Sequence, residues 1–346
     1  MRIVVVGATG NVGTSVLQAL GQDERAESVL GIARRIPEQS YPKVEWASAD
    51  IARDDLAAHF RGADAVVHLA WLIQPSRDLD HLYRVNVEGS QRLFAAVAEA
   101  SVQALVYASS VGAYSPGPKD RFVDESWPTN GISSSYYSRH KAEVEVILDA
   151  FERDHSDVRV VRMRPGLIFK RESAEEQRRL FAGPFVPSRL IRPGLIPFVP
   201  DIPRLRFQAV HSQDVGRAYA LAALGDARGP FNLAADPVLD PPRLARLLRT
   251  RTLRVPQRVA RAAASATWQL RLQPSPPGWL DLALAVPLLD TTRARTELEW
   301  EPRYTAEEAI AEVVKGIRDR AGALTPPLDP DIPRAEEIKS GVGSEE

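Results

Sequence analysis

The sequence predicts an α/β fold built on a doubly wound parallel sheet, and three observations lead to this prediction. Residues 3–6 form the apolar run Ile-Val-Val-Val, which is typical of a strand buried on both faces. This run ends in the glycine-rich segment 7–13, and the apolar positions that follow have the spacing of a helix. Segments typical of strands and helices then alternate from residue 2 to about residue 163, the order that produces parallel sheets.

The segment 7–13 reads Gly-Ala-Thr-Gly-Asn-Val-Gly and stands where the first strand turns into a helix. Glycines at such a turn let the backbone approach a pyrophosphate, and the N–H groups and dipole of the helix N-terminus favour its negative charge. The segment therefore indicates a dinucleotide site. The residues expected to contact the cofactor here are Gly7, Thr9, Gly10, Asn11, Val12 and Gly13.

Tyr137 and Lys141 are a candidate acid/base pair, because residues four apart lie on one face of a helix. An ammonium near a phenol favours the phenolate, so the pKa of Tyr137 would fall from about 10 toward neutral pH. Such a tyrosine can act as a general acid or base. An isolated pair of this kind is more often a packing contact, and the competing Tyr136 has His140 at the same spacing.

Two hydroxyl side chains, Ser109 and Ser110, follow the apolar run 104–108. Ligands of open α/β sheets bind beyond the carboxyl ends of the strands, so these serines would lie near a bound substrate. Together with the alternation of strands and helices, they favour a catalytic role for Tyr137 over a packing role.

In these and other stretches the sequence resembles the extended short-chain dehydrogenase/reductases, also called the NAD-dependent epimerase/dehydratase family. The resemblance extends over about residues 1–320. It implies a Rossmann-type doubly wound sheet with a smaller C-terminal substrate-binding subdomain, and an NAD(P)-dependent enzyme. The matching stretches are residues 7–13, 49–51 (Ala-Asp-Ile), 67–70 (Val-His-Leu-Ala), 86–89 (Asn-Val-Glu-Gly), 109–110, 137–141, 164–166 (Arg-Pro-Gly) and 210–215 (Val-His-Ser-Gln-Asp-Val).

The resemblance assigns roles to individual side chains. It implies that Tyr137 is the catalytic acid/base, and that Lys141 holds the nicotinamide ribose while lowering the pKa of the tyrosine. Ser110 would hydrogen-bond the substrate oxygen. We prefer Ser110 to Ser109 because it directly precedes the family-like stretch 111–114. Asn86 would tie down the backbone behind the site, its alternative role being that of a buried amide.

The adenosine side of the cofactor is assigned in the same way. Asp50 resembles the residue that hydrogen-bonds the adenine amine, and Leu69 and Ala70 would line the adenosine. The two remaining positions that the resemblance places at the cofactor are Ile51 and Pro165.

Cofactor choice is expected to depend on the end of the second strand, residues 29–33, which is followed by Arg34 and Arg35. NAD-binding proteins usually place an acidic residue there for the ribose 2′-hydroxyl, whereas arginine accommodates a 2′-phosphate. No acidic residue stands at 33–36. We therefore expect NADP, with NAD as the alternative.

The expected domain organisation follows the resemblance and the composition. Residues 1–170 would form the Rossmann domain, completed by about 205–235. Residues 171–204 and 236–320 would form the substrate-binding subdomain, in which the proline-rich stretch 184–203 is hostile to regular helix. The proline-rich and charged end, residues 322–346, is expected to be a mobile or surface tail.

Composition limits the remaining possibilities. The 346 residues contain no cysteine, which excludes disulfides and thiolate chemistry, and the six histidines form no close pair, so no metal site is expected. The net charge of −1, with basic residues scattered along the chain, predicts no nucleic-acid or membrane partner. No signal peptide or membrane span is recognisable, so a cytoplasmic protein is expected, possibly a homodimer.

Departures from subfamily patterns narrow the expected reaction. Nucleotide-sugar 4,6-dehydratases follow the active-site hydroxyl with Asp-Glu, whereas Val111 and Gly112 follow Ser110 here. Many nucleotide-sugar enzymes carry an asparagine shortly after Arg-Pro, where this chain has residues 166–169, Gly-Leu-Ile-Phe. The prediction is an oxidoreductase that interconverts a secondary alcohol and a ketone on a small, fairly apolar substrate. The alternatives are a sugar-nucleotide epimerase that holds NAD tightly and a non-catalytic NADP-binding sensor.

Overall fold

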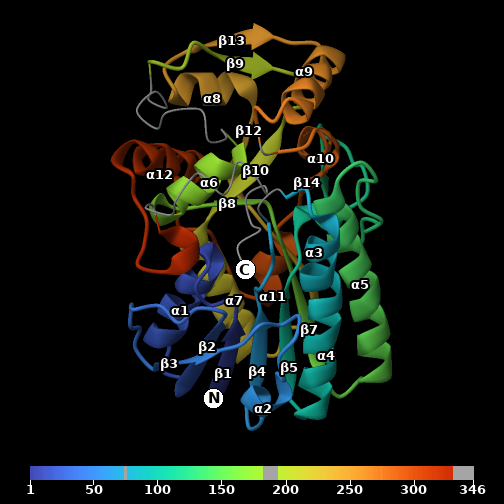
Figure 1. The fold of residues 1–346 in the computed structure, drawn as a ribbon, viewed down its shortest axis with the longest axis vertical. Coiled ribbons are helices and arrows are strands. Elements are labelled where there is room, and N and C mark those ends of the chain that lie inside the picture. The colour runs from blue at the N-terminus through green and yellow to red at the C-terminus, as the bar shows by residue number, and fades with distance from the viewer. Residues whose placement is uncertain (74–75, 182–193, 274, 330–346) are drawn as a thin grey trace.

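The computed structural model of the protein describes residues 1–73, 76–181, 194–273 and 275–329 (Figure 1). Its largest element is a sheet of seven strands in the order β11-β7-β5-β4-β1-β2-β3. All neighbouring strands in this sheet are parallel. The strands are β1 (Arg2–Val6), β2 (Ser28–Ala33), β3 (Val44–Ser48), β4 (Ala65–His68), β5 (Ala104–Ala108), β7 (Arg159–Pro165) and β11 (Gly229–Leu233).

The strand order reverses between β1 and β4, and this switch point is where open α/β sheets bind ligands. The chain runs outward from β1 to β3 on one side, and from β4 toward β11 on the other. The predicted α/β class with a doubly wound parallel sheet is therefore confirmed.

Helices cover both faces of the large sheet. The helices of the chain are α1 (Asn11–Gln22), α2 (Ala57–Phe60), α3 (Leu79–Tyr83), α4 (Gly89–Glu99), α5 (Tyr136–Asp154), α6 (Ala174–Phe181), α7 (Ser212–Leu224), α8 (Pro241–Leu247), α9 (Gln257–Gln269), α10 (Gly278–Ala285), α11 (Thr292–Glu297) and α12 (Ala306–Asp319). Among the described residues none of these helices is long and apolar enough to cross a membrane.

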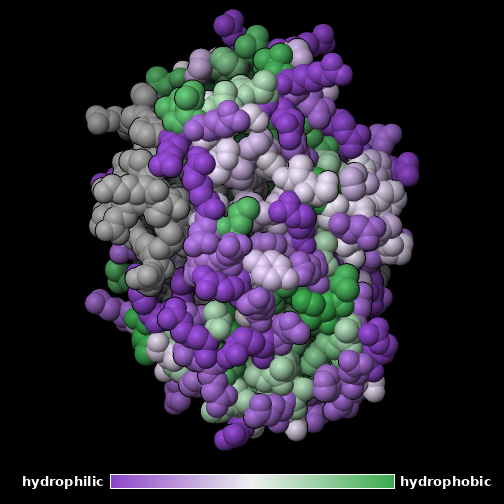
Figure 2. Space-filling view, turned by 45° about the vertical axis from the view of Figure 1, so that its right-hand side comes forward, coloured by the Kyte–Doolittle hydropathy of each residue, from purple (hydrophilic) through white to green (hydrophobic). Residues whose placement is uncertain are grey.

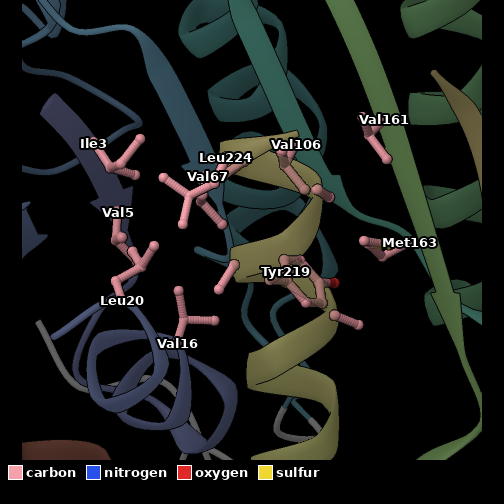
Figure 3. Close-up of a cluster of buried hydrophobic side chains, with 14 of the residues drawn as sticks. Ile3, Val5, Val16, Leu20, Val67, Val106, Val161, Met163, Tyr219 and Leu224 are labelled. Carbon is pink, nitrogen blue, oxygen red and sulfur yellow. The ribbon is translucent and has the colours of Figure 1, made fainter. Parts of the chain in front are cut away.

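Alternate side chains of each strand enter two different hydrophobic clusters, as the period of two in a strand requires. Ile3 and Val5 point to the face covered by α1 and α7, where Figure 3 shows them beside side chains of both helices. Val4 and Val6 point to the opposite face, covered by α4 and α5. Because β1 is apolar on both faces, it can only be a central strand.

A second layer of structure stands above the carboxyl ends of the large sheet (Figure 1). It contains a three-stranded sheet, β12-β10-β8, on which α12 packs, and two parallel strand pairs, β13-β9 and β14-β6. Helix α7 and β11 return the chain from this layer to the large sheet. The bounds of its strands are β6 (Phe122–Val123), β8 (Leu167–Phe169), β9 (Phe198–Asp201), β10 (Phe207–His211), β12 (Ala235–Leu239), β13 (Arg251–Arg254) and β14 (Leu288–Leu289).

The segment expected to be a tail is described only in its first part. Within residues 322–329, Thr325 and Leu328 are buried, and a short 3-10 turn, Pro326–Leu328, lies beside α6. The rest of that expected tail, 330–346, lies outside the described residues, as does much of the proline-rich stretch 184–203.

Helices α1 and α7 pack closely enough to require a glycine. A Cβ atom on Gly216 of α7 would lie 2.5 Å from the backbone carbon and oxygen of Ser15 in α1. Next to this contact the hydroxyls of Ser15 and Ser212 form a hydrogen bond of 2.9 Å. The two helices therefore form one rigid support beneath β1 and the glycine-rich turn.

We predict that Gly216→Ala lowers the free energy of unfolding by about 1–3 kcal/mol, because the added methyl group has no space. Urea unfolding measures this loss. Gly10→Ala is the matched control: its Cβ would meet nothing closer than the oxygen of Gly7 at 3.6 Å, so a loss below about 1 kcal/mol is expected. Equal losses in both variants would contradict the close helix packing.

Candidate active site

The glycine-rich turn is shaped by two close backbone contacts. Gly7 has a φ of +84°, and a Cβ there would lie 2.6 Å from the amide nitrogen of Ala70. A Cβ on Gly13 would lie 2.5 Å from the carbonyl oxygen of Gly7. Glycines at these two positions therefore let β1, α1 and the end of β4 converge.

Gly10 differs from the other two glycines, because a Cβ there would meet nothing closer than the carbonyl oxygen of Gly7 at 3.6 Å, an ordinary contact. It is the N-cap of α1, and no side chain among the described residues caps this helix end. The N–H groups of the first turn are thus available to an anion. The Oδ1 atom of Asn11 is also buried without a hydrogen-bond partner in the described part of the chain. This turn fits the pyrophosphate of a dinucleotide, and Thr9 and Val12 lie within it.

A buried lysine adds positive charge to the same helix end. Lys170, which directly follows β8, donates from Nζ to the carbonyl oxygen of Asn11 at 2.7 Å and to Oγ1 of Thr14 at 2.5 Å. Burial lowers the pKa of Lys170 to about 8. Nζ also donates to Oγ of Ser15 at 3.2 Å, so its three protons all have acceptors in α1. The charge of Lys170 would attract an anion bound at this helix end. The glycine-rich segment 7–13 does not include Lys170. The sequence indicated the position of this lysine only in that it directly follows an apolar strand.

Ser110 and Tyr137 meet beyond the carboxyl end of β5. Tyr137 lies in the first turn of α5, which is capped by Ser135. The Oγ atom of Ser110 accepts a hydrogen bond from the amide of Gly112 at 3.0 Å, and the ring of Tyr137 lies beside the same glycine. A Cβ on Gly112 would lie 2.8 Å from Cε1 of Tyr137, so the glycine makes room for the ring.

Ser109 faces away from Tyr137 and into a buried ion-pair network. Its hydroxyl donates to Oε1 of Glu145 at 2.5 Å, and Arg164 binds both carboxylate oxygens of Glu145. Burial would raise the pKa of Glu145, yet the bond and charge of Arg164 hold it below its ordinary value. Ser109 is thus engaged in this network, whereas Ser110 lies beside Tyr137. Contact of Ser110 with a substrate stays a prediction.

Lys141 lies one turn after Tyr137 and is also buried. Its Nζ donates to the carbonyl oxygen of Ala108 at 2.6 Å and lies 3.4 Å from the ring centre of Trp71. The same Nζ is 6.0 Å from the ring centre of Tyr137. The pair thus shares one helix face, but the ammonium points toward Trp71 and the end of β5.

The acidity of Tyr137 differs from the sequence expectation. Burial raises the pKa of Tyr137 to about 12, and the neighbouring hydroxyl of Ser110 opposes this rise. Burial also holds the pKa of Lys141 well below its ordinary value. The expectation that Lys141 lowers the pKa of the phenol is therefore wrong, because burial raises this pKa and Lys141 is not among the groups that lower it.

Two tryptophans flank the tyrosine. The ring of Trp279, from α10, lies 5.1 Å from that of Tyr137 at an interplanar angle of 32°, and Trp71 meets it edge-on at 6.1 Å. Trp71 belongs to the segment that follows β4, whereas Trp279 comes from the second layer. The contacts of these two tryptophans with Tyr137 were not predicted from the sequence.

The remaining predicted positions surround the switch point. Asn86, fully buried in a π-helical turn, exchanges two hydrogen bonds with the backbone of Leu72, at 2.7 and 3.0 Å, and so fixes the segment that carries Trp71. The amide of Leu69 donates to the carbonyl oxygen of Val6, which holds the ends of β4 and β1 together.

On the adenosine side, the carboxylate of Asp50 accepts from the amide of Ala52 at 2.9 Å and pairs with Arg53 at 3.1 Å. Ile51 is buried against Gly89. Pro165 is buried at the end of β7, away from this side. The contacts of these three residues with a cofactor stay predictions.

Arg34 and Arg35 are exposed directly after β2. The amide of Gly7 donates to the carbonyl oxygen of Ile32, so both arginines lie at the same edge of the sheet as the glycine-rich turn. This is the position from which a side chain reaches the 2′-position of an adenosine ribose. No group of three His, Asp or Glu residues in the described ranges could hold a metal ion.

Comparison with known proteins identifies the family of this arrangement. A model described as "NAD dependent epimerase/dehydratase family" matches residues 3–186. The chain belongs to this family. The resemblance seen in the sequence is thereby confirmed, and the Ser110, Tyr137 and Lys141 set lies within the matched part of this NAD dependent epimerase/dehydratase family member.

Several known proteins are similar to this chain, over half of its length or over nearly all of it. The uncharacterized protein Rv0501 of Mycobacterium tuberculosis is 27% identical, over 97% of this chain and 88% of that protein. A NAD-dependent glucose-6-phosphate dehydrogenase of Haloferax volcanii is 29% identical, over 51% of this chain and 72% of that enzyme. A solved UDP-glucose-4-epimerase of Stenotrophomonas maltophila, with bound NAD, shares the fold with a TM-score of 0.69 and 22% identity, covering 92% of this chain and 98% of that one.

We predict that Gly10→Ala leaves the stability almost unchanged but weakens binding of NADPH and NADH at least tenfold. The added methyl group has room in the protein, yet it occupies the space through which the pyrophosphate reaches the N–H groups of α1. Titration followed by tryptophan fluorescence measures this effect, because Trp71 and Trp279 flank Tyr137. Unchanged affinity in Gly10→Ala would place the nucleotide elsewhere.

Proposed function

We propose that the protein is an NAD(P)-dependent oxidoreductase that interconverts a secondary alcohol and a ketone on a small, fairly apolar substrate. The observation that carries this proposal is the placement of Ser110 and Tyr137 side by side at Gly112, with Lys141 one helical turn away. The pair lies beyond β5, on the side of the switch point opposite β2. Hydroxyl groups in this place can hold a substrate oxygen and move a proton to or from it.

In the reducing direction, Ser110 holds the carbonyl oxygen of the substrate and Tyr137 donates its proton to that oxygen. The nicotinamide, when bound, supplies the hydride for the carbonyl carbon. A pKa of about 12 keeps Tyr137 protonated throughout the neutral range, so the acid form is always present. Lys141 would contribute its buried Nζ to the ribose hydroxyls of the cofactor.

In the oxidising direction, Tyr137 must first lose its proton in order to accept that of the alcohol. Because burial raises the pKa of Tyr137, the fraction of phenolate grows with pH up to about 12. The rate of alcohol oxidation is therefore expected to increase as the pH rises through the alkaline range. Ketone reduction needs the protonated form of Tyr137, which is already present at neutral pH.

The walls of the site support an apolar substrate. Tyr137 belongs to a hydrophobic cluster with Ile132, Leu282 and Val286, and Trp71 and Trp279 pack against this cluster. Aromatic and aliphatic side chains around a few polar groups are typical of pockets for small organic molecules.

NADP is the preferred cofactor in this proposal, since Arg34 and Arg35 stand at the edge of the sheet where a 2′-phosphate would lie. NAD is the alternative. It is favoured by the names of the Haloferax volcanii dehydrogenase and of the epimerase structure with bound NAD.

A second candidate in the same family is an epimerase that oxidises and then reduces its substrate on one tightly held NAD. The shared fold with UDP-glucose-4-epimerase favours it. Against a sugar nucleotide, β8 begins with Leu167 and Ile168, apolar side chains where many such enzymes have an asparagine. A non-catalytic sensor is less well supported, because it would not need the Ser110 and Tyr137 pair.

We predict that Tyr137→Phe lowers turnover by on the order of a hundredfold or more, with little change in nucleotide affinity, because only the transferred proton is lost. Steady-state kinetics with a panel of apolar ketones, together with nucleotide titration, measures both effects. The neighbouring Tyr136→Phe is the matched control, since Tyr136 is equally buried beside Trp279. Full activity of Tyr137→Phe would remove this residue from the mechanism.

We also predict that Arg34→Ala combined with Arg35→Ala weakens NADPH at least tenfold and NADH less than about twofold, because only NADPH carries the 2′-phosphate. Arg153→Ala, on the exposed end of α5, is the control for loss of a surface charge. Equal weakening of the two nucleotides would contradict the assignment of the 2′-phosphate to this edge.

A further inference from the structure

One end of the molecule carries a concentration of positive charge that the whole-chain composition hides. The full sequence has a net charge of −1, yet residues 241–280 contain no lysine, aspartate or glutamate and eight arginines. The arginines are Arg243, Arg246, Arg249, Arg251, Arg254, Arg258, Arg261 and Arg271. This stretch forms α8, β13 and α9, which with β9 lie at the top of Figure 1, farthest from the N-terminus.

Most of these arginines lack an ionic partner. Arg243 pairs with Glu307 and Arg261 with Asp281. The other six are exposed and make no salt bridge within the described ranges of the chain. The positive charge of these six arginines is therefore exposed to solvent and does not stabilise the fold through salt bridges.

Exposed apolar side chains gather at the same end. The large apolar residues that the described chain exposes there are Leu195, Phe198, Leu253, Val259, Leu270 and Leu272. In the upper part of Figure 2, hydrophobic residues lie beside strongly hydrophilic ones. We call the surface formed by β9, β13, α9 and residues 270–272 the cap surface. Clusters of exposed apolar residues rimmed by charge mark binding surfaces.

Helix α9 presents an apolar stripe outward. Val259, Ala263, Ala266 and Leu270 have helical spacing and are all exposed, with Val259 at 57% and Leu270 at 69%. The half-buried side of the helix, which includes Trp268, faces the molecule and lies near α10. None of the residues of α9 is buried. The stripe thus has no partner among the described residues.

We propose that the cap surface binds peripherally to a membrane that carries anionic lipid headgroups. A helix with an apolar stripe and flanking arginines lies in the plane of a membrane interface, with its apolar face at the boundary of the acyl chains. Each arginine near an anionic leaflet adds a further attraction that salt weakens. Arg254 and Arg258 flank the start of α9, and Arg271 follows its end. The proposal does not depend on the proposed reaction.

The chemistry of the cap surface favours lipid over other partners. A second copy of the chain, docked through the same face, would place arginines opposite arginines. A nucleic acid would neutralise the charge but leave Val259, Leu270 and Leu272 without apolar contacts. The one aromatic residue of α9, Trp268, is covered by Arg77 at 3.7 Å and is not free to stack on a base. No membrane partner was expected from the sequence because the net charge was taken over the whole chain. In that sum, acidic residues elsewhere cancel the positive charge of this end.

Sedimentation of the full chain with vesicles tests the proposal. We expect binding to vesicles of phosphatidylcholine mixed with phosphatidylglycerol, no binding to phosphatidylcholine alone, and a loss of binding as the salt concentration rises. Absence of binding to the anionic vesicles, or equal binding to both kinds, overturns the proposal.

Paired variants separate the cap surface from the rest of the molecule. Arg254→Glu with Arg258→Glu, and separately Val259→Ser with Leu270→Ser, should each lower the vesicle affinity at least tenfold without changing the thermal unfolding temperature, because all four side chains are exposed. Arg153→Glu with Val146→Ser, on the exposed side of α5, is the matched control and should bind as the wild type does.

Two outcomes assign the cap surface to another partner and overturn the proposal. One is a dimer in light scattering that Leu270→Ser dissociates while vesicle binding is unaffected. The other is binding of the cap surface to duplex DNA, lost in the double arginine variant, with no binding to anionic vesicles.

Discussion

The site depends on a set of close backbone contacts at the switch point that only glycine permits. The glycine Gly7 packs against the backbone of Ala70, and Gly13 packs against the carbonyl oxygen of Gly7. In α7, Gly216 packs against the backbone of Ser15 in α1. These contacts bring the end of β1, the start of α1 and the segment after β4 to one place. An added methyl group at any of these glycines would lie 2.5–2.6 Å from backbone atoms, so the elements would have to move apart.

Two buried lysines lie on either side of this convergence. Lys170 donates to the first turn of α1, and Lys141 donates to the end of β5, with Trp71 over its Nζ. Burial lowers the pKa of both amines. Burial of an ammonium group is costly. In the proposed complex, the pyrophosphate and the ribose hydroxyls of a dinucleotide would offset part of this cost. The electrostatics of the site and its glycine geometry thus point to the same class of ligand.

The sequence predicted the fold because local signals and topology agree: apolar runs, glycines at a turn and helical spacing all belong to one sheet order. The sequence also correctly predicted that Tyr137 and Lys141 share one helix face, because this prediction needs only their separation of four residues. It could not predict Trp71 and Trp279, whose contacts with Tyr137 join segments far apart in the chain. The pKa of Tyr137 was predicted in the wrong direction, because burial is a property of the folded chain.

We propose that the site between the glycine-rich turn and α5 binds a nicotinamide dinucleotide, and that this dinucleotide dissociates after each turnover. The most direct measurement denatures the purified protein, assays any released nucleotide, and titrates the nucleotide-free protein with NADPH and NADH. We expect that the purified protein retains little nucleotide, and that it binds NADPH and NADH saturably, with the higher affinity for NADPH. Failure to bind either nucleotide would contradict the dinucleotide site, and NAD retained in an equimolar amount would contradict the dissociating oxidoreductase and support the epimerase.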